Sequence, residues 1–263
     1  QFGGMLNSFS AVFVTILMGS LIGDATKAQI SQATPALFIA LAIFAIAFVV
    51  LLISRIPEPA AEAEAAAAKS DKKDPHSAFS FRHFKLGILA IFLYLGVEVG
   101  TPTYILQYLT SAADAATPGF GMDAGIAATL VAMYWLLMVV GRLLGGIIAG
   151  KVSSKALLTG VSIATLVLVL VGMFAPTDTL VTAFGIEGST GRFVTCEVPV
   201  GIFALVLVGL CTSVMWGAIF NLAVEGLGKY TAIASGAFMT MVCGGGILVP
   251  LQGDRKSTRL NSS

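Results

Sequence analysis

Apolar residues run along this 263-residue chain in seven long blocks, and the charged residues gather between them. A helix needs about 20 mainly apolar residues to cross the hydrocarbon core of a bilayer. None of the blocks carries the polar stripe that a surface helix of a soluble bundle would show. The pattern predicts an all-α, polytopic membrane helix bundle with spans at Phe2–Gly23, Pro35–Ile53, Lys85–Leu109, Met122–Ala149, Ala156–Phe174, Pro199–Asn221 and Ala232–Gln252.

The composition supports a lipid environment. Hydrophobic residues make up 57% of the chain, charged residues make up 11%, and the mean hydropathy is +0.93. An average soluble domain is about 25% charged. The net charge of +1 gives no indication of a nucleic-acid partner, so the partner that the composition predicts is the lipid bilayer.

Lysine and arginine alternate between successive connections, as the positive-inside rule expects of a membrane protein. Most of them lie in the segment Ser54–Lys85 and in the turns after the fourth and sixth blocks, at Arg55, Lys69, Lys72, Lys73, Arg82, Lys85, Arg142, Lys151, Lys155 and Lys229. We therefore expect these three connections to be cytoplasmic, and Thr110–Gly121 and Pro176–Val198 to lie on the outer side.

The sequence carries none of the motifs that an integral-membrane enzyme would need. Walker loops, HExxH and GxSxG are absent. Both histidines, His76 and His83, lie in the charged connection, and the three cysteines form no disulfide or metal framework. We expect no enzymatic activity, no cofactor and no metal site.

The charged connection and the chain ends differ from the apolar blocks. Pro57 and Pro59 end the second block, because proline lacks the donor that a helix needs. The alanine-rich Ala60–Lys69 predicts a short helix or an unstructured connector. Residues 254–263 resemble a translated sequencing adapter, so we expect a non-native tail there. Gln1 opens directly into an apolar block, and both ends look cut.

Four motifs, in this order and spacing, resemble the fucose–proton symporter family of the major facilitator superfamily. Met5–Ser10 is similar to that family's "FNSLG" opening of helix five, and Phe92–Gly100 to its "FLYVGxEV" stretch in helix seven. Ile219–Thr231 resembles its "IFxLAxxGLG" turn between helices ten and eleven, and Gly244–Pro250 its "GGAIIP" in helix eleven. The resemblance covers Gln1–Gly253.

The resemblance implies part of a twelve-helix sugar transporter with two six-helix halves. Residues 1–53 would be the last two helices of the N-terminal half, 54–84 the cytoplasmic linker, and 85–253 the first five helices of the C-terminal half. The family's best-attested acidic residues lie in its first four helices, so no position here inherits their role. Such a protein would be a multi-pass protein of a bacterial inner membrane and a monomer when complete.

Glu98 is the sharpest single candidate for chemistry. A carboxylate near mid-membrane costs roughly 2.5–3.5 kcal/mol on insertion scales, so it should face a central water-accessible cavity or the bundle interior. Gly96, Gly100 and Pro102 are able to interrupt the helix there, as at many transporter sites. We expect Glu98 to handle a proton or substrate. The alternative is a structural carboxylate bonded to a neighbouring helix, with glycines for close packing.

Other polar and aromatic residues suit a sugar. The amide of Gln107 donates and accepts, but on a straight helix it points away from Glu98, and the two converge only if the Gly100–Pro102 segment bends. Tyr104 is a further candidate on this helix, whereas Tyr108 fits an interfacial aromatic belt. Aromatic rings also stack on sugars, which adds Tyr134, Trp135 and Trp216, with Thr212 and Asn221 as polar neighbours. Plain packing, or a gate for Asn221, is the alternative for these residues.

Arg142 lies in the glycine-rich run Gly141–Lys151, which allows close helix approach. The run vaguely resembles the superfamily's gating loop but lacks its acidic partner. We therefore expect Arg142 to lie near the cytoplasmic surface as a topological anchor, and we expect no unpaired arginine at the membrane centre.

These observations predict a segment of a secondary active transporter, a proton-coupled symporter of a neutral monosaccharide such as a hexose or deoxyhexose, with sodium as the alternative coupling ion. A transporter of drugs or organic acids is the rival within the same fold. A non-transporting membrane sensor is the rival from another class, but the connection between the second and third blocks is too short to hold an output domain.

Overall fold

The computed structural model describes residues 2–22, 30–54, 77–112, 119–148, 150–188 and 190–260. Helical segments cover most of each of the seven predicted spans. The helices are α1 (Phe2–Ile22), α2 (Ile30–Ile53), α4 (Arg82–Thr110), α5 (Ala124–Ile148), α6 (Ser154–Phe174), α7 (Val200–Thr212), α8 (Met215–Val224), α9 (Thr231–Thr240) and α10 (Gly244–Leu260). Short 3₁₀ turns lie at η1 (Ala78–Ser80), η2 (Gly228–Tyr230) and η3 (Met241–Cys243).

The membrane helix bundle predicted from the sequence is confirmed. Within the described residues, five segments are long and apolar enough to cross a membrane: Arg82–Thr110, Ala124–Ile148, Ser154–Phe174, Val200–Val224 and Gly228–Gly253. Two shorter apolar helical stretches, Leu6–Leu17 and Leu37–Ile53, belong to α1 and α2. Nearly all of the predicted connector between α2 and η1, including Ala60–Lys69, lies outside the described residues.

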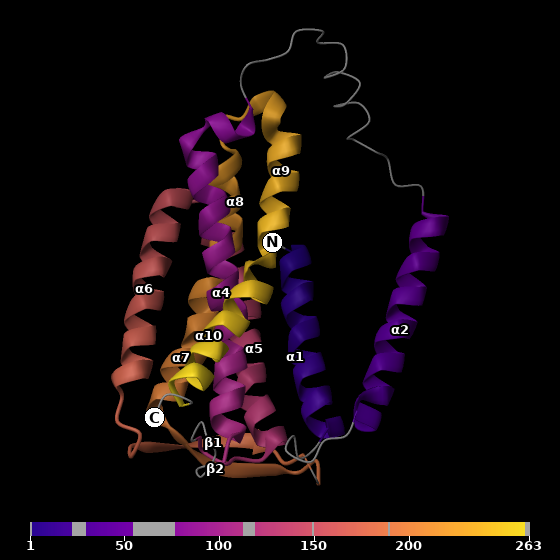
Figure 1. The fold of residues 1–263 in the computed structure, drawn as a ribbon, viewed down its shortest axis with the longest axis vertical. Coiled ribbons are helices and arrows are strands. Elements are labelled where there is room, and N and C mark those ends of the chain that lie inside the picture. Colours follow the sequence, from indigo (N-terminus) through magenta and orange to yellow (C-terminus); the bar gives the residue numbers. More distant parts are fainter. Residues whose placement is uncertain are drawn as a thin grey trace.

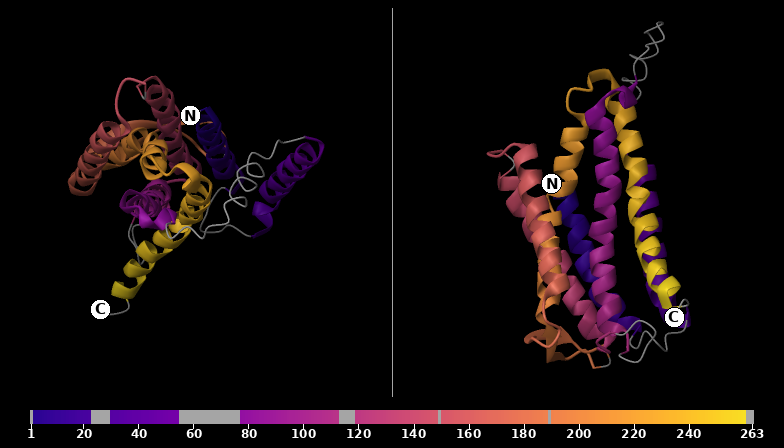
Figure 2. Two further views of the ribbon diagram at one scale, coloured as in Figure 1. Left: turned by 90° about the horizontal axis from the view of Figure 1, so that it is seen from above. Right: turned by 60° about the vertical axis from the view of Figure 1, so that its left-hand side comes forward.

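The helices form one bundle with a single outlier (Figures 1 and 2). α1 packs along α5, α6 packs on α7 and α8, and α10 packs on α4. α2 stands apart from the bundle, and every one of its described side chains is exposed. A helix that is apolar on all sides and contacts α1 alone among the described elements with more than a few contacts fits a lipid or helix–helix environment rather than water.

The connections alternate between the two ends of the bundle. The chain enters α4, passes from α5 to α6, and passes from α8 to α9 at one end (Figure 1). Among the described residues, Arg82, Lys85, Lys151, Lys155 and Lys229 therefore lie toward the same end of the bundle. Which end faces the cytoplasm stays a prediction.

A β-hairpin closes the opposite end and was not predicted. β1 (Leu180–Ile186) and β2 (Phe193–Pro199) pair antiparallel with Ala183 opposite Cys196, and they run across the helix ends (Figure 1). Asp123 fixes the hairpin to α5. Its carboxylate accepts N–H groups from Gly125 and Ile126 at the start of α5, and from Gly188 in the hairpin turn.

Two predicted single spans are broken in the structure, and the break predicted in a third is absent. The sixth span divides into α7 and α8 at Ser213–Val214, and the seventh divides at η3. α4 is one helix from Arg82 to Thr110, although it contains Pro102. The prediction that the Gly/Pro run interrupts this helix is therefore wrong. α10 continues as a helix to Leu260, into the predicted tail.

Candidate functional site

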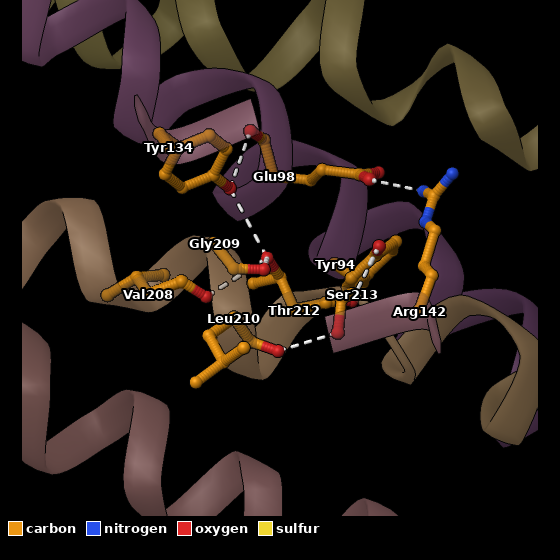
Figure 3. A network of polar contacts seen from close by, with 9 residues as sticks. All are labelled: Tyr94, Glu98, Tyr134, Arg142, Val208, Gly209, Leu210, Thr212 and Ser213. Atoms are coloured by element: carbon orange, nitrogen blue, oxygen red, sulfur yellow. Dashed lines mark hydrogen bonds and ion pairs between the residues drawn. The ribbon is translucent and has the colours of Figure 1, made fainter. Parts of the chain in front are cut away.

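A polar network lies inside the bundle where α4, α5 and the α7–α8 break meet (Figure 3). Its members are buried, with Glu98 8% and Arg142 9% exposed. They are the two charged residues that are buried in the described part of the chain. The network is the strongest candidate site, because charged groups inside a membrane bundle are costly and tend to mark ion or substrate pathways.

Pro102 accounts for one hydrogen bond of the network, which forms where α4 lacks a helical donor. Proline has no N–H, so within the helix it leaves the carbonyl of the residue four positions earlier without its donor. That residue is Glu98, and the Tyr134 hydroxyl donates to its carbonyl at 3.1 Å. The side chain from α5 thus replaces the missing helical donor, and α4 continues.

Thr212, the last residue of α7, is the node of the network. The Tyr94 hydroxyl donates to the Thr212 carbonyl at 3.0 Å, and the Tyr134 hydroxyl lies 3.3 Å from the Thr212 Oγ1. Thr212 Oγ1 in turn contacts the carbonyls of Val208 and Gly209. Because α7 ends here, the Thr212 carbonyl needs a partner from another helix, and Tyr94 of α4 supplies it.

The expectation that Arg142 anchors the cytoplasmic surface is wrong. Its Nη2 lies 3.4 Å from Oε1 of Glu98, and both side chains are 10% exposed. The two helices run in opposite directions, and helical side chains lean toward their own N-terminus. Arg142 therefore leans toward the hairpin end of the bundle, and Glu98 leans toward the opposite end. The two side chains meet inside the bundle.

Glycines on α5 allow this geometry. A Cβ at Gly141 would lie 2.7 Å from the Leu210 carbonyl oxygen and 2.8 Å from the Ser213 Cβ. Gly145 similarly faces the Val214 side chain. Only a residue without a side chain lets α5 approach the α7–α8 break this closely. The small-residue pattern of the sequence thus packs α5 on α7–α8, as that pattern predicted.

The Glu98 side chain is buried inside the bundle, and the water-accessible cavity expected beside it stays a prediction. The carboxylate faces Arg142 and Tyr94. A cavity of about 570 Å³ lies nearer the hairpin end, and its lining includes Tyr104, Gln107, Tyr108 and Gln252 but not Glu98. Gln107 lines this cavity and Glu98 does not, so the cavity does not bring the two residues together. The Tyr104 hydroxyl donates to the Val249 carbonyl at 2.7 Å.

The remaining predicted residues lie in three different places. Tyr134 is fully buried, and Trp135 packs edge-on against it with ring centroids 5.3 Å apart. Trp216 stacks on Phe220 at 5.8 Å and touches Phe238 edge-on, in an aromatic cluster at the linker end. Asn221 is exposed and lines a separate pocket beside the start of α6. The structure therefore gathers Glu98, Tyr134 and Thr212, but not the whole predicted set.

Within the described residues, no group of three or more His, Cys, Asp or Glu side chains could hold a metal ion. The buried polar chemistry of the described part is instead one carboxylate, one guanidinium and a few hydroxyls.

Comparison with known proteins identifies the family. The model of the Major Facilitator Superfamily matches residues 2–250. The chain belongs to the major facilitator superfamily. Membership of a transporter superfamily agrees with the prediction of a membrane transporter rather than an enzyme.

The similar proteins in this superfamily are bacterial sugar transporters. The chain is 29% identical to a glucose/galactose transporter of Brucella abortus, over 96% of its own length and 54% of the relative's. It is 26% identical to a putative glucose/galactose transporter of Helicobacter pylori, over 96% and 53% of the two lengths. It is 24% identical to the L-fucose-proton symporter of Escherichia coli, over 65% and 33%. No solved structure gives a significant match.

These relatives confirm the predicted likeness to the sugar transporters of this superfamily. The chain spans about half the length of the two glucose/galactose relatives. Sequence reasoning found Glu98 but missed its partner. The available indication was an arginine within a predicted apolar span, beside Gly141 and Gly145. Glycines at a close helix contact place neighbouring side chains inside a bundle.

Proposed function

We propose that this chain is the helix-five-to-eleven part of a proton-coupled transporter of a neutral monosaccharide, a hexose or deoxyhexose, in a bacterial cytoplasmic membrane. The observation that carries the proposal is the buried Glu98 network in a chain similar, over 96% of its length, to a glucose/galactose transporter. Glu98 is the proposed proton-carrying residue. Its carboxyl group can bind and release a proton, it is shielded from bulk water, and it contacts the Arg142 guanidinium of α5.

The charges of the site fit a neutral substrate, because the positive and the negative side chain are paired with each other. Arg142 is paired with Glu98, so the network offers no surplus cation to an anionic substrate such as an organic acid. Amide and hydroxyl groups read sugar hydroxyls by donating and accepting. Gln107, Tyr104, Trp135, Trp216 and Asn221 stay predicted sugar contacts, with Tyr134 and Thr212 bonded into the network that positions Glu98.

The test is uptake of labelled sugar by the complete coding sequence that carries residues 1–253, in a host lacking its own sugar transport. We expect accumulation of glucose, galactose or fucose that a protonophore abolishes and that does not require sodium. Accumulation that survives the protonophore but stops without sodium would contradict proton coupling. No sugar uptake, together with export of a drug or uptake of an organic acid, would contradict the substrate class.

A further inference from the structure

A groove lies on the surface of the bundle at its linker end, where α4 and α6 begin and α8 ends. Both α4 and α6 pack on α8, and residues of all three helices line the groove. Its volume of about 650 Å³ is within the range of small-ligand sites. A Cβ at Gly87 of α4 would collide with the Ala223 side chain of α8, so these two helices approach closely and form the floor.

The lining of the groove changes in the same order along all three helices. His83 and Lys155 are the second residues of α4 and α6, and Glu225 directly follows α8. One turn further into the bundle, each helix contributes an apolar side chain instead. These side chains are Leu86, Leu158 and Leu222. A rim of polar groups above an apolar floor fits an amphiphile that lies along the helices.

The charges at this rim remain available to a ligand. Within the described part of the chain, neither the Lys155 ammonium nor the Glu225 carboxylate forms an ion pair with another side chain. The same two residues line the pocket that adjoins the groove beside the start of α6. A cation and an anion thus stand at the rim of one apolar groove without neutralising each other.

The exposure of this face fits an acyl chain. Leu86 is 56% exposed, and the membrane-spanning part of α6 is only 6% buried. Apolar surface of this extent on a membrane helix is a contact surface for lipid or for another helix. The two charges at the rim favour lipid, because they add a site for a polar headgroup directly beside the apolar surface.

We propose that the groove binds a zwitterionic phospholipid with an ethanolamine headgroup, an inference that goes beyond sugar transport and does not depend on it. The lipid phosphate pairs with Lys155 and accepts a hydrogen bond from His83. The lipid ammonium pairs with Glu225. One acyl chain follows Leu158 toward Ala90, which lines the inner part of the groove.

The headgroup follows from the rim charges. A primary ammonium donates hydrogen bonds to a carboxylate, whereas the trimethylammonium of a choline lipid has no N–H to donate. A phosphatidylglycerol headgroup carries the phosphate but no cation, so Glu225 repels it. Lys155 alone would accept any phospholipid, and Glu225 is the residue that selects ethanolamine.

The test is lipid binding to the complete protein, purified in detergent and measured by native mass spectrometry. The probes are the dioleoyl forms of phosphatidylethanolamine, phosphatidylcholine and phosphatidylglycerol, which share their acyl chains and differ in the headgroup. We expect the wild type to bind the ethanolamine lipid about two- to fivefold more tightly than either of the others, the strength of one exposed ion pair.

Two charge variants separate the two headgroup contacts. Lys155→Gln should weaken the binding of all three lipids about two- to fivefold, because each carries a phosphate. Glu225→Gln should weaken only the ethanolamine lipid, which then binds like the choline lipid. The matched controls are Lys151→Gln and Glu197→Gln, which remove exposed charges outside the groove and should match the wild type.

A third variant blocks the acyl chain. Ala90→Phe places a ring in the inner part of the groove and should weaken all three lipids at least as much as Lys155→Gln. Unfolding temperatures in lipid-free detergent check the fold. Lys155→Gln and Glu225→Gln should unfold like the wild type, because both residues are exposed.

Two results would overturn the proposal. The first is equal binding of the three lipids by the wild type, or tighter binding of the glycerol lipid. The second is a groove covered by a further helix of the complete protein. Ala90→Phe would then lower the unfolding temperature without changing lipid binding, and Lys155→Gln would behave like Lys151→Gln. The expected lipid pattern in a protein that transports no sugar would contradict only the proposed function.

Discussion

The hydroxyl of Tyr134 donates to the backbone carbonyl of Glu98, the carbonyl that Pro102 leaves without a helical donor. One bond thus joins a helix defect on α4, an aromatic side chain on α5 and the residue that we propose carries a proton. The same hydroxyl touches Thr212 at the end of α7, so three helices share one polar junction.

This relationship predicts a non-additive pair of mutations. Tyr134→Phe leaves the Glu98 carbonyl buried and unsatisfied, which should cost about 1–3 kcal/mol of stability. Pro102→Ala restores an N–H to the helix at this point, so Tyr134→Phe should cost less in that background. Thermal or denaturant unfolding of the four forms in detergent checks this. Equal costs in both backgrounds would show that the Tyr134 hydroxyl does not replace the proline's missing donor.

Close packing at Gly141 gives a second prediction. Gly141→Ala places a Cβ 2.7 Å from the Leu210 carbonyl oxygen, and overpacking of this kind costs about 1–3 kcal/mol. Gly160 on α6 is the matched control, since nothing lies within 4 Å of a Cβ built there. Gly160→Ala should be neutral or stabilise by up to about 1 kcal/mol. The measurement is the yield and the unfolding temperature of both variants. Similar values for the two variants would contradict the close contact of Gly141 with Leu210.

The hairpin predicts that a thiol introduced at position 195 and the natural thiol of Cys196 react at different rates. Cys196 lies on the bundle-facing side of β2 with its thiol 3.6 Å from the Ala183 carbonyl, whereas Thr195 is exposed. Burial raises the pKa of the Cys196 thiol, and only the thiolate reacts with maleimides. At pH 7, Thr195→Cys should therefore be labelled much faster than Cys196, and the gap should narrow as the pH rises.

This labelling also tests the topology if it is done on intact cells with an impermeant reagent. A background of Cys211→Ser and Cys243→Ser removes the other thiols. We expect Thr195→Cys to react from outside and a cysteine in place of Ser70 to stay unlabelled. The reverse pattern would invert the predicted orientation, and equal rates at positions 195 and 196 would contradict the hairpin's orientation.

Asp123 provides a fourth prediction. Its carboxylate accepts hydrogen bonds from the start of α5 and from Gly188 of the hairpin turn. Loss of such a cap costs about 0.5–2 kcal/mol. Asp123→Ala should therefore make the hairpin turn more susceptible to limited proteolysis, while Asp178→Ala, which alters a carboxylate preceding β1, should not. Cleavage at the same rate in both variants would argue against this anchor.

The positions of the helices followed from the sequence, because a membrane span is encoded locally by its run of apolar residues. The hairpin was missed for a different reason. Leu180–Ile186 and Phe193–Pro199 contain β-branched and aromatic residues around a glycine-containing turn, which is a recognisable hairpin pattern. The pattern is short and stands between two long apolar runs, which makes the segment resemble an outer loop.

The sequence indicates that Arg142 lies inside the bundle, because it stands beside close-packing glycines, but it does not show that Arg142 meets Glu98. The two residues are 44 positions apart, and their meeting depends on how α4 and α5 are rotated about their axes. The contacts of Gly141 with α7 help to set that rotation, and they appear only once the helices are packed. The continuity of α4 past Pro102 was equally hidden, since the hydroxyl that bonds the free carbonyl comes from another helix.

In the proposed function, Glu98 carries the coupling proton of a sugar transporter. The most direct measurement compares accumulation with exchange of labelled sugar for the wild type and Glu98→Gln in the complete protein, with Glu197→Gln as the matched control. Glutamine keeps the size and much of the hydrogen bonding of glutamate but cannot titrate. We expect Glu98→Gln to lose proton-driven accumulation while retaining exchange of sugar across the membrane, and Glu197→Gln to behave as the wild type. Full accumulation by Glu98→Gln with an unchanged pH profile would contradict the account.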